Sequence, residues 1–240
     1  MKVIVIIPTY NEKDNIGKLI DSIQQVFKNM SHDMNILVVD DNSPDGTAEL
    51  VENFMKNYSN VHLITGEKRG LGNAYIRGMK YAINTLNADV VMEMDADFSH
   101  KPEDIPRLIS TLEDGADFVI GSRYVTGGKI PDDWSFFRKM NSKFGNIFTR
   151  YIIGIHAVHD CTAGFRAIRA SVIKKINLSQ LKVQGYVFQI ALLNQAIKTS
   201  CKVKEVPVEF VDRVRGETKL GFSDIIEFIY NVFIIKFRKY

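Results

Sequence analysis

A nearly unbroken run of Val and Ile at residues 2–8 constrains the fold of this chain more than any other feature. A strand that is apolar at consecutive positions is covered on both faces, which is typical of a parallel sheet. A turn of Thr9, Tyr10, Asn11 and Glu12 follows. Because parallel neighbours need a crossover connection, the run predicts that helices and strands alternate after it.

The first half of the chain shows this alternation. Further strands are predicted at residues 35–39, 61–65, 88–94 and 117–121. Helices are predicted at residues 15–27, from the turn at 40–47 to residue 55, and at 73–85. The order predicts an α/β fold with a mainly parallel, Rossmann-like central sheet and helices on both faces. With 240 residues, 45% of them apolar, the chain suits one domain with appended elements.

Two common nucleotide-binding motifs are absent from the sequence. No Gly-x-Gly-x-x-Gly follows the first strand, and there is no Gly-x-x-x-x-Gly-Lys-Ser/Thr loop. Their absence argues against a dehydrogenase and a P-loop nucleotidase. Gly70 and Gly72 precede the helix at 73–85. They predict either close approach of a ligand or simply a tight loop with a helix cap.

Two carboxylates, Asp95 and Asp97, follow the strand at 88–94. Mg²⁺ and Mn²⁺ prefer oxygen ligands and usually combine one or two carboxylates with phosphate oxygens and water. Ligands of open α/β sheets gather at the carboxyl ends of strands, so the pair predicts a site for a cation and a diphosphate. A bare Asp-x-Asp can also cap a helix or lie in a turn, and residues 101–104 begin a helix.

Charge is divided unequally along the chain. Residues 1–122 contain 11 Lys and Arg against 19 Asp and Glu, whereas the remainder contains 20 against 9. A basic second half indicates an anionic partner, which could be a phosphate group, an anionic lipid or a nucleic acid. Cys161 and Cys201 lack metal-ligand spacing, so we expect buried reduced thiols.

Six segments occur together in one order. They are PTYNE at 8–12, VVDDNSPDGT at 38–47, MDADFSH at 94–100, GSRY at 121–124, GFRA at 164–167, and VDR with GETKL within 211–220. The set resembles a family-2 glycosyltransferase and, with GYVFQ at 185–189, more narrowly the dolichyl-phosphate (polyprenyl-phosphate) mannose synthases. The resemblance implies a glycosyltransferase A fold with a catalytic domain at 1–220. Residues 1–122 would form its nucleotide-binding half and 123–220 its acceptor-binding half, followed by an amphipathic helix at 221–240.

The resemblance also implies a donor site. The nucleoside would be held by Pro8, Tyr10, Glu12, Val39 and Asp41, although Glu12 and Asp41 could instead be capping or turn residues. The diphosphate would be held by Asp95, Ala96 and Asp97, with Asp95 and Asp97 as ligands of Mg²⁺ or Mn²⁺, and by Arg123, Arg213 and Lys219. Arg213 and Lys219 flank a loop at 214–218 that would close over the donor. Ser99 stands where many relatives carry a Gln ligand.

For the acceptor, the resemblance implies that Arg123, Arg138 and Ser142 hold a phosphate, since an Arg fork pairs with phosphate oxygens. Asp97, Arg123 and Arg138 would be the catalytic residues. A hexose, most simply mannose from GDP-mannose, would pass to a polyprenyl or dolichyl phosphate by one inverting displacement. A phosphate is already ionised near neutral pH and needs no general base, and Gln189 is neutral where hydroxyl-transferring relatives carry an acid.

Three alternatives remain open. A UDP-glucose or other hexose donor would use the same motifs. A nucleotidyltransferase shares the topology but normally carries a Gly-rich loop with Arg after the first strand, which 8–12 lacks. A nucleic-acid-binding module is supported only by the basic second half, without any accompanying signature, so we expect no nucleic-acid partner.

Two segments suggest a membrane surface. A helix at 136–155 would place six apolar residues on one face, with basic residues flanking it (Phe137, Met140, Phe144, Phe148, Tyr151, Ile155; Lys139, Lys143, Arg150). A core helix with solvated lysines is the alternative. The segment at 222–237 is apolar but interrupted by acids, so we expect no transmembrane helix. Without a signal peptide, we expect peripheral association with the cytoplasmic face, directly or through a membrane-embedded partner subunit.

Overall fold

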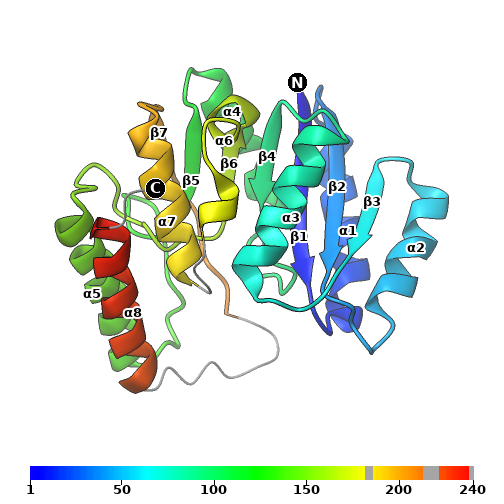
Figure 1. Cartoon of the computed structure of the whole chain (residues 1–240). Helices are drawn as coiled ribbons and strands as arrows, with labels where there is room; N and C mark the ends of the chain where they lie inside the picture. Colours follow the sequence, from blue (N-terminus) through cyan, green and yellow to red (C-terminus); the bar gives the residue numbers. More distant parts are fainter. Residues whose placement is uncertain (182–185, 213–221, 238–240) are drawn as a thin grey trace.

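The computed structural model of the chain describes residues 1–181, 186–212 and 222–237. Its strands form one sheet in the order β3-β2-β1-β4-β6-β5-β7 (Figure 1). The strands are β1 (Lys2–Thr9), β2 (Asp33–Asp40), β3 (Val61–Thr65), β4 (Val90–Glu93), β5 (Phe118–Ser122), β6 (Arg166–Arg169) and β7 (Val203–Pro207). All pairs are parallel except those of β6 with β4 and β5. The mainly parallel sheet predicted from the sequence is confirmed.

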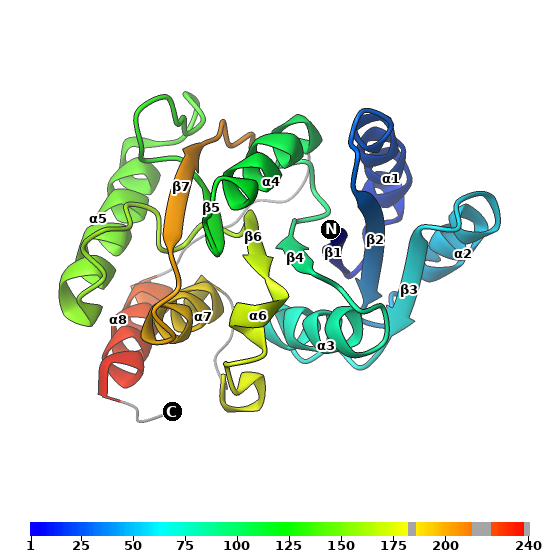
Figure 2. The same ribbon diagram turned by 90° about the horizontal axis from the view of Figure 1, so that it is seen from above.

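Helices cover both faces of the sheet, and Figure 2 shows α1 and α4 on one face and α3, α6 and α7 on the other. The α-helices are α1 (Lys13–Phe27), α2 (Thr47–Asn57), α3 (Leu71–Asn84), α4 (Ile105–Glu113), α5 (Phe136–Ile153), α6 (Ala170–Ile173), α7 (Tyr186–Lys198) and α8 (Phe222–Phe237). Short 3₁₀ helices are η1 (Pro102–Asp104) and η2 (Leu178–Gln180).

Strand β1 is the centre of the core. Residues 3–7 are fully buried, and their side chains alternate between two apolar clusters, one under each helical layer. Gly78 lets α3 lie directly on this strand, because a Cβ there would come within 2.6 Å of Ile6 Cγ2. The consecutive Val and Ile residues are therefore explained by burial on both faces.

The topology collects loops at one edge of the sheet. Strands β1, β2, β4 and β5 end at this edge, and β6 begins there because it runs antiparallel. The predicted nucleotide-binding and acceptor-binding halves share the sheet, since β6 and β7 lie beside strands from the first half. Residues far apart in sequence therefore meet at the carboxyl edge.

Helices α5 and α8 lie side by side beyond β7 (Figures 1 and 2). Phe148 of α5 meets Phe233 of α8 with ring centroids 5.9 Å apart. Helix α5 ends at Ile153, before Gly154 in the left-handed region with φ of +88°. The sequence prediction was wrong for Ile155, which lies past the helix and is buried. Within the described part of the chain, no helix combines the length and apolar character needed to cross a membrane.

Candidate active site

Asp95 and Asp97 lie just after β4 at the carboxyl edge of the sheet. Tyr75 of α3 donates a hydrogen bond to Asp95 Oδ1 at 3.1 Å, and the Ser99 backbone N–H donates to Asp97 Oδ1 at 3.0 Å. The His100 ring accepts a hydrogen bond from the Asp95 backbone N–H at 3.1 Å. Its Nε2 lies 4.0 Å from Asp95 Oδ2. The acidic pair is thus fixed by neighbours while both side chains retain solvent exposure.

The donor set suits a hard divalent cation. Among the described residues, no group of three or more His, Cys, Asp or Glu side chains could hold a metal ion. Mg²⁺ or Mn²⁺ does not require such a group, because phosphate oxygens and water usually complete its coordination. Asp95 and Asp97 therefore fit a cation that arrives with a diphosphate. The Ser99 hydroxyl is buried and makes no hydrogen bond to the described residues.

A buried charged pair lies beneath Asp95. Glu93 of β4 and Arg166 of β6 are register partners and are both fully buried. Arg166 donates to the carbonyl oxygens of Gln189 at 2.7 Å and Cys161 at 2.9 Å, and its Nε lies 3.9 Å from Glu93 Oε2. Burial raises the pKa of Glu93 to about 7, against the opposing effects of Arg166 and the nearby Gln189 amide. In the sequence, the only sign of this buried pair is a Glu inside an otherwise apolar strand.

Tyr10 and Glu12 occupy the turn after β1. The Tyr10 ring is 38% exposed, and Lys68 Nζ lies 3.4 Å from its centroid. The carboxylate of Glu12 accepts a hydrogen bond from the Asn15 side chain at 2.8 Å. Glu12 is at the cap position of α1 but makes no side-chain cap. An exposed ring and a carboxylate are thus available at this edge.

The remaining predicted nucleoside residues are less exposed. Asp41 is buried and accepts a hydrogen bond from Arg77 of α3 at 2.6 Å, so it is not the solvated turn residue considered from the sequence. Val39 is fully buried in the core between β1 and β3, so its side chain and its main chain are both covered by protein. Pro8 is half-buried and Ala96 buried. Sequence reasoning missed Arg77 because its partner is 36 positions away.

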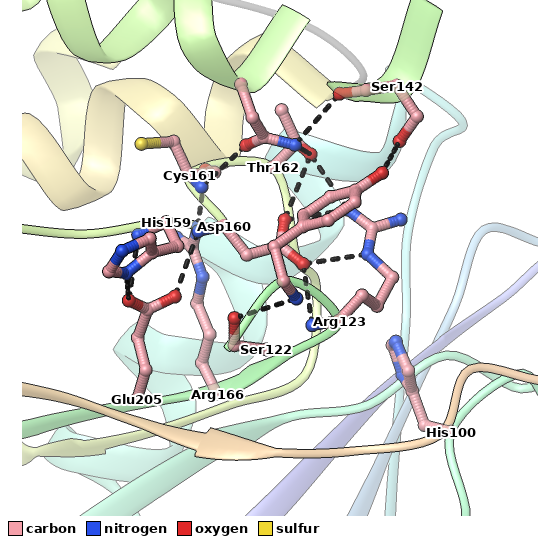
Figure 3. Close-up of polar contacts among 12 residues, drawn as sticks. His100, Ser122, Arg123, Ser142, His159, Asp160, Cys161, Thr162, Arg166 and Glu205 are labelled. Carbon is pink, nitrogen blue, oxygen red and sulfur yellow. Dashed lines mark hydrogen bonds and ion pairs between the residues drawn. The ribbon is translucent and has the colours of Figure 1, made fainter. Parts of the chain in front are cut away.

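Arg123, predicted from the sequence to hold an acceptor phosphate, follows β5 and is held by Asp160 (Figure 3). Asp160 is fully buried and accepts hydrogen bonds from Arg123 Nε and Nη2, both at 2.7 Å, and from its backbone N–H at 3.0 Å. Burial would raise the pKa of Asp160, but the Arg123 charge and these hydrogen bonds hold it below the usual value. The loop before β6 therefore orients Arg123.

Arg138 and Ser142 lie one turn apart on α5. Arg138 makes two hydrogen bonds to the Asp212 carboxylate, at 2.8 and 3.0 Å, and its guanidinium lies 4.0 Å from the Trp134 ring. Ser142 Oγ accepts a hydrogen bond from the Tyr124 hydroxyl at 2.6 Å. Both residues thus contact the segments that follow β5 and β7 at the carboxyl edge.

Aromatic rings connect the two sides of the site. Phe210 makes edge contacts with His100 at 6.0 Å and with Trp134 at 5.8 Å between centroids. The Arg123 guanidinium lies 5.5 Å from the same ring. A series of ring contacts thus runs from His100, beside Asp95, through Phe210 to Arg123, and from Phe210 through Trp134 to Arg138. Sequence reasoning missed the roles of Trp134 and Phe210, which carry no polar signature.

The remaining sequence predictions concern the loop at 214–218, with the residues that flank it, and the two cysteines. Arg213, Lys219 and the loop at 214–218 lie outside the described residues. Both cysteines are free; Cys161 is buried, and burial raises its thiol pKa to about 12, whereas Cys201 is only half-buried, contrary to expectation.

Comparisons with known proteins identify the family of this chain. A sequence model of Glycosyl transferase family 2 matches residues 4–176. Polyprenol monophosphomannose synthase of Mycolicibacterium smegmatis is 40% identical over 96% of this chain and 85% of its own length. Undecaprenyl-phosphate mannosyltransferase of Micrococcus luteus is 38% identical over 97% of this chain and 93% of its own.

One solved structure illustrates the likeness in fold. Glucosyl-3-phosphoglycerate synthase from Mycobacterium tuberculosis, in complex with Mn²⁺ and UDP-glucose, is 17% identical and gives a TM-score of 0.67 over 95% of this chain and 75% of that one.

Proposed function

The chain belongs to glycosyl transferase family 2, and from that premise we propose that it transfers mannose from GDP-mannose to the phosphate of a polyprenyl phosphate. The observation that carries the proposal is the series of ring contacts that links Asp95, through His100 and Phe210, to Arg123 and, through Trp134, to Arg138. The mannosyl transfer named in the two relatives supports the choice of sugar and acceptor.

The donor would lie along the ends of β1, β2 and β4. Tyr10 would stack on the base, while Glu12 and Asp41 would accept hydrogen bonds from the nucleoside. Pro8, Val39 and Ala96 would line the nucleoside site. Asp95 and Asp97 would hold Mg²⁺ or Mn²⁺, which neutralises the charge of the leaving diphosphate when bound. Arg213 and Lys219, which lie outside the described residues, would contact the same diphosphate.

The acceptor phosphate would be held by Arg123, Arg138 and Ser142. These residues would fix an anionic oxygen against the anomeric carbon of the donor, so that the sugar is displaced with inversion. Gln189 is buried near Asp95 and cannot take up a proton. None needs to be taken up, because the attacking phosphate is already ionised.

A labelled-donor assay tests the proposed function. The protein is incubated with a short polyprenyl phosphate, Mn²⁺ and, in separate reactions, labelled GDP-mannose, UDP-glucose and UDP-N-acetylglucosamine. We expect label to enter the organic phase from GDP-mannose alone. If label enters the organic phase from a UDP-sugar instead, that sugar nucleotide is the donor. If no labelled lipid forms from any of the three donors, the proposed function is contradicted.

Substituting Arg138 should impair acceptor use. We expect Arg138→Ala to raise the KM for polyprenyl phosphate about tenfold or more, because a charged hydrogen bond is lost, with the donor KM changed less than about twofold. The pair with Asp212 is one-third exposed, so its loss should cost little stability. Steady-state kinetics against the neighbouring variant Lys139→Ala measure the effect. Equal changes in both KM values would remove Arg138 from the acceptor site.

We also propose that α5 and α8 form the contact with the cytoplasmic face of a membrane, directly or through an embedded partner. Large apolar side chains are exposed along both helices: Phe136, Phe137, Met140, Phe144, Ile147 and Tyr151 on α5, and Ile226, Tyr230, Phe233 and Phe237 on α8. Phe148, expected on the exposed face, packs against α8 instead. Such a face would enter the interface of an anionic bilayer.

Two substitutions on α5 test the direct route. Phe137 and Tyr151 are each 72% exposed, so Phe137→Ser with Tyr151→Ser should lower cosedimentation with phosphatidylglycerol vesicles about tenfold or more. Met55→Ser with Leu71→Ser, at exposed apolar positions elsewhere, is the matched control. Binding that survives the α5 changes, or is equally lost in the control, would count against direct contact.

A further inference from the structure

The Arg123–Asp160 contact is the most completely bonded ion pair at the site. Three N–H groups of Arg123 are directed at one carboxylate, and Thr162 Oγ1 accepts a further hydrogen bond from Nη2 at 2.9 Å (Figure 3). The Arg123 side chain is 11% exposed and Asp160 is fully buried. A pair of this kind sets both the position and the plane of the guanidinium.

The loop that carries the Asp160 carboxylate is anchored by two other elements. Glu205 of β7 accepts hydrogen bonds from the backbone N–H groups of His159 at 2.7 Å and Asp160 at 2.9 Å. Asn146 of α5 accepts from the Cys161 backbone N–H at 2.8 Å and donates to Thr162 at 3.2 Å. The loop that carries Asp160 is therefore fixed from both sides before it meets Arg123.

We propose that Asp160 is a positioning residue, which acts through Arg123 to present the guanidinium to the acceptor phosphate. This inference rests on the proposed function and names a residue for it. Nε and Nη2 form one edge of the Arg123 guanidinium, and both donate to Asp160. Turning that edge toward the phosphate would therefore break the ion pair. The phosphate therefore meets a cation of fixed orientation, and the protein avoids the entropic cost of ordering a long side chain on binding.

Binding of farnesyl phosphate, measured by calorimetry, tests this role without requiring turnover. Asp160→Asn replaces an acceptor oxygen by an amide N–H that faces the Arg123 donors. We expect the Kd to rise about tenfold, as for loss of a charged hydrogen bond. An unchanged Kd would overturn the proposal.

A double variant separates positioning from general damage. If Asp160 acts only through Arg123, then adding Asp160→Asn to Arg123→Gln should weaken farnesyl phosphate binding no further. If the two substitutions weaken binding by factors that multiply in the double variant, the proposal is contradicted. Asp117→Asn is the matched control, since Asp117 precedes β5 at the opposite end and also faces an Arg, at 3.8 Å. We expect its Kd to match the wild type, and an equal loss there would overturn the proposal.

Should Asp160→Asn fail to fold, Thr162→Val provides the test. It removes one acceptor from Arg123 Nη2 and should raise the Kd about threefold, but not in the Arg123→Gln background. No change in either background would overturn the proposal. The proposed function fails separately: a wild type that binds farnesyl phosphate but transfers no sugar refutes the activity alone. A wild type that binds no farnesyl phosphate refutes both.

Discussion

The Asp97→Ala variant is expected to lose transfer activity by about 10³-fold or more while keeping the wild-type fold. Asp97 is partly exposed at the carboxyl edge, and its Oδ1 accepts a hydrogen bond from the Ser99 backbone N–H in the same loop. Removing its carboxylate therefore leaves the core intact. It deprives the leaving diphosphate of the charge compensation that a bound cation supplies.

The measurement pairs turnover with metal binding. Transfer of labelled mannose is followed alongside Mn²⁺ binding in the presence of GDP-mannose, and thermal unfolding reports the fold. Asp114→Ala is the control, because Asp114 is exposed at the end of α4 and should behave as the wild type. Turnover within about tenfold of wild type in Asp97→Ala would remove this residue from the site.

The second large effect concerns stability. Arg166→Met should lower the free energy of unfolding by about 3–5 kcal/mol, because Glu93, whose pKa is already raised to about 7, would have to stay buried without its cation or take up a proton. The two carbonyl oxygens that accept from Arg166 would also lose their donors. Urea denaturation measures the change, with activity followed at a concentration where the variant is folded.

A paired substitution supplies the control. Replacing both partners, as Glu93→Leu with Arg166→Met, removes the buried charge as well as its partner, so much of the lost stability should return. If the double variant is as unstable as Arg166→Met, packing rather than the unpaired carboxylate accounts for the loss. If Arg166→Met is itself as stable as wild type, the pair has no structural role.

The fold was largely predictable because its strands are apolar at consecutive positions. The run at 2–8 and those after it place five strands that run in the same direction in one sheet, and with them the edge to which Asp95 and Arg123 belong. Strand β6 was not predicted, since it has four residues, begins and ends with Arg, and runs against its neighbours.

The site was predictable by residue type but not by partner. Asp41, Asp95 and Arg123 come together at the predicted edge, yet their bonds to Arg77, Tyr75 and Asp160 span 20 to 37 positions. Such bonds depend on strand order and on the direction of β6, neither of which periodicity encodes. The proposed roles of these residues toward ligands remain predictions.

Helix α5 has two different sides, and their combination has a consequence for substrate range. Its inner side bonds to Tyr124 and to the loop before β6 through Ser142 and Asn146, while its outer side carries exposed aromatic residues. A molecule resting on that outer side would keep the proposed phosphate site within roughly one helix diameter, about 10 Å, of the lipid head groups. The isoprenoid tail could then stay in the hydrocarbon while its head alone is glycosylated, so tail length should matter little to turnover.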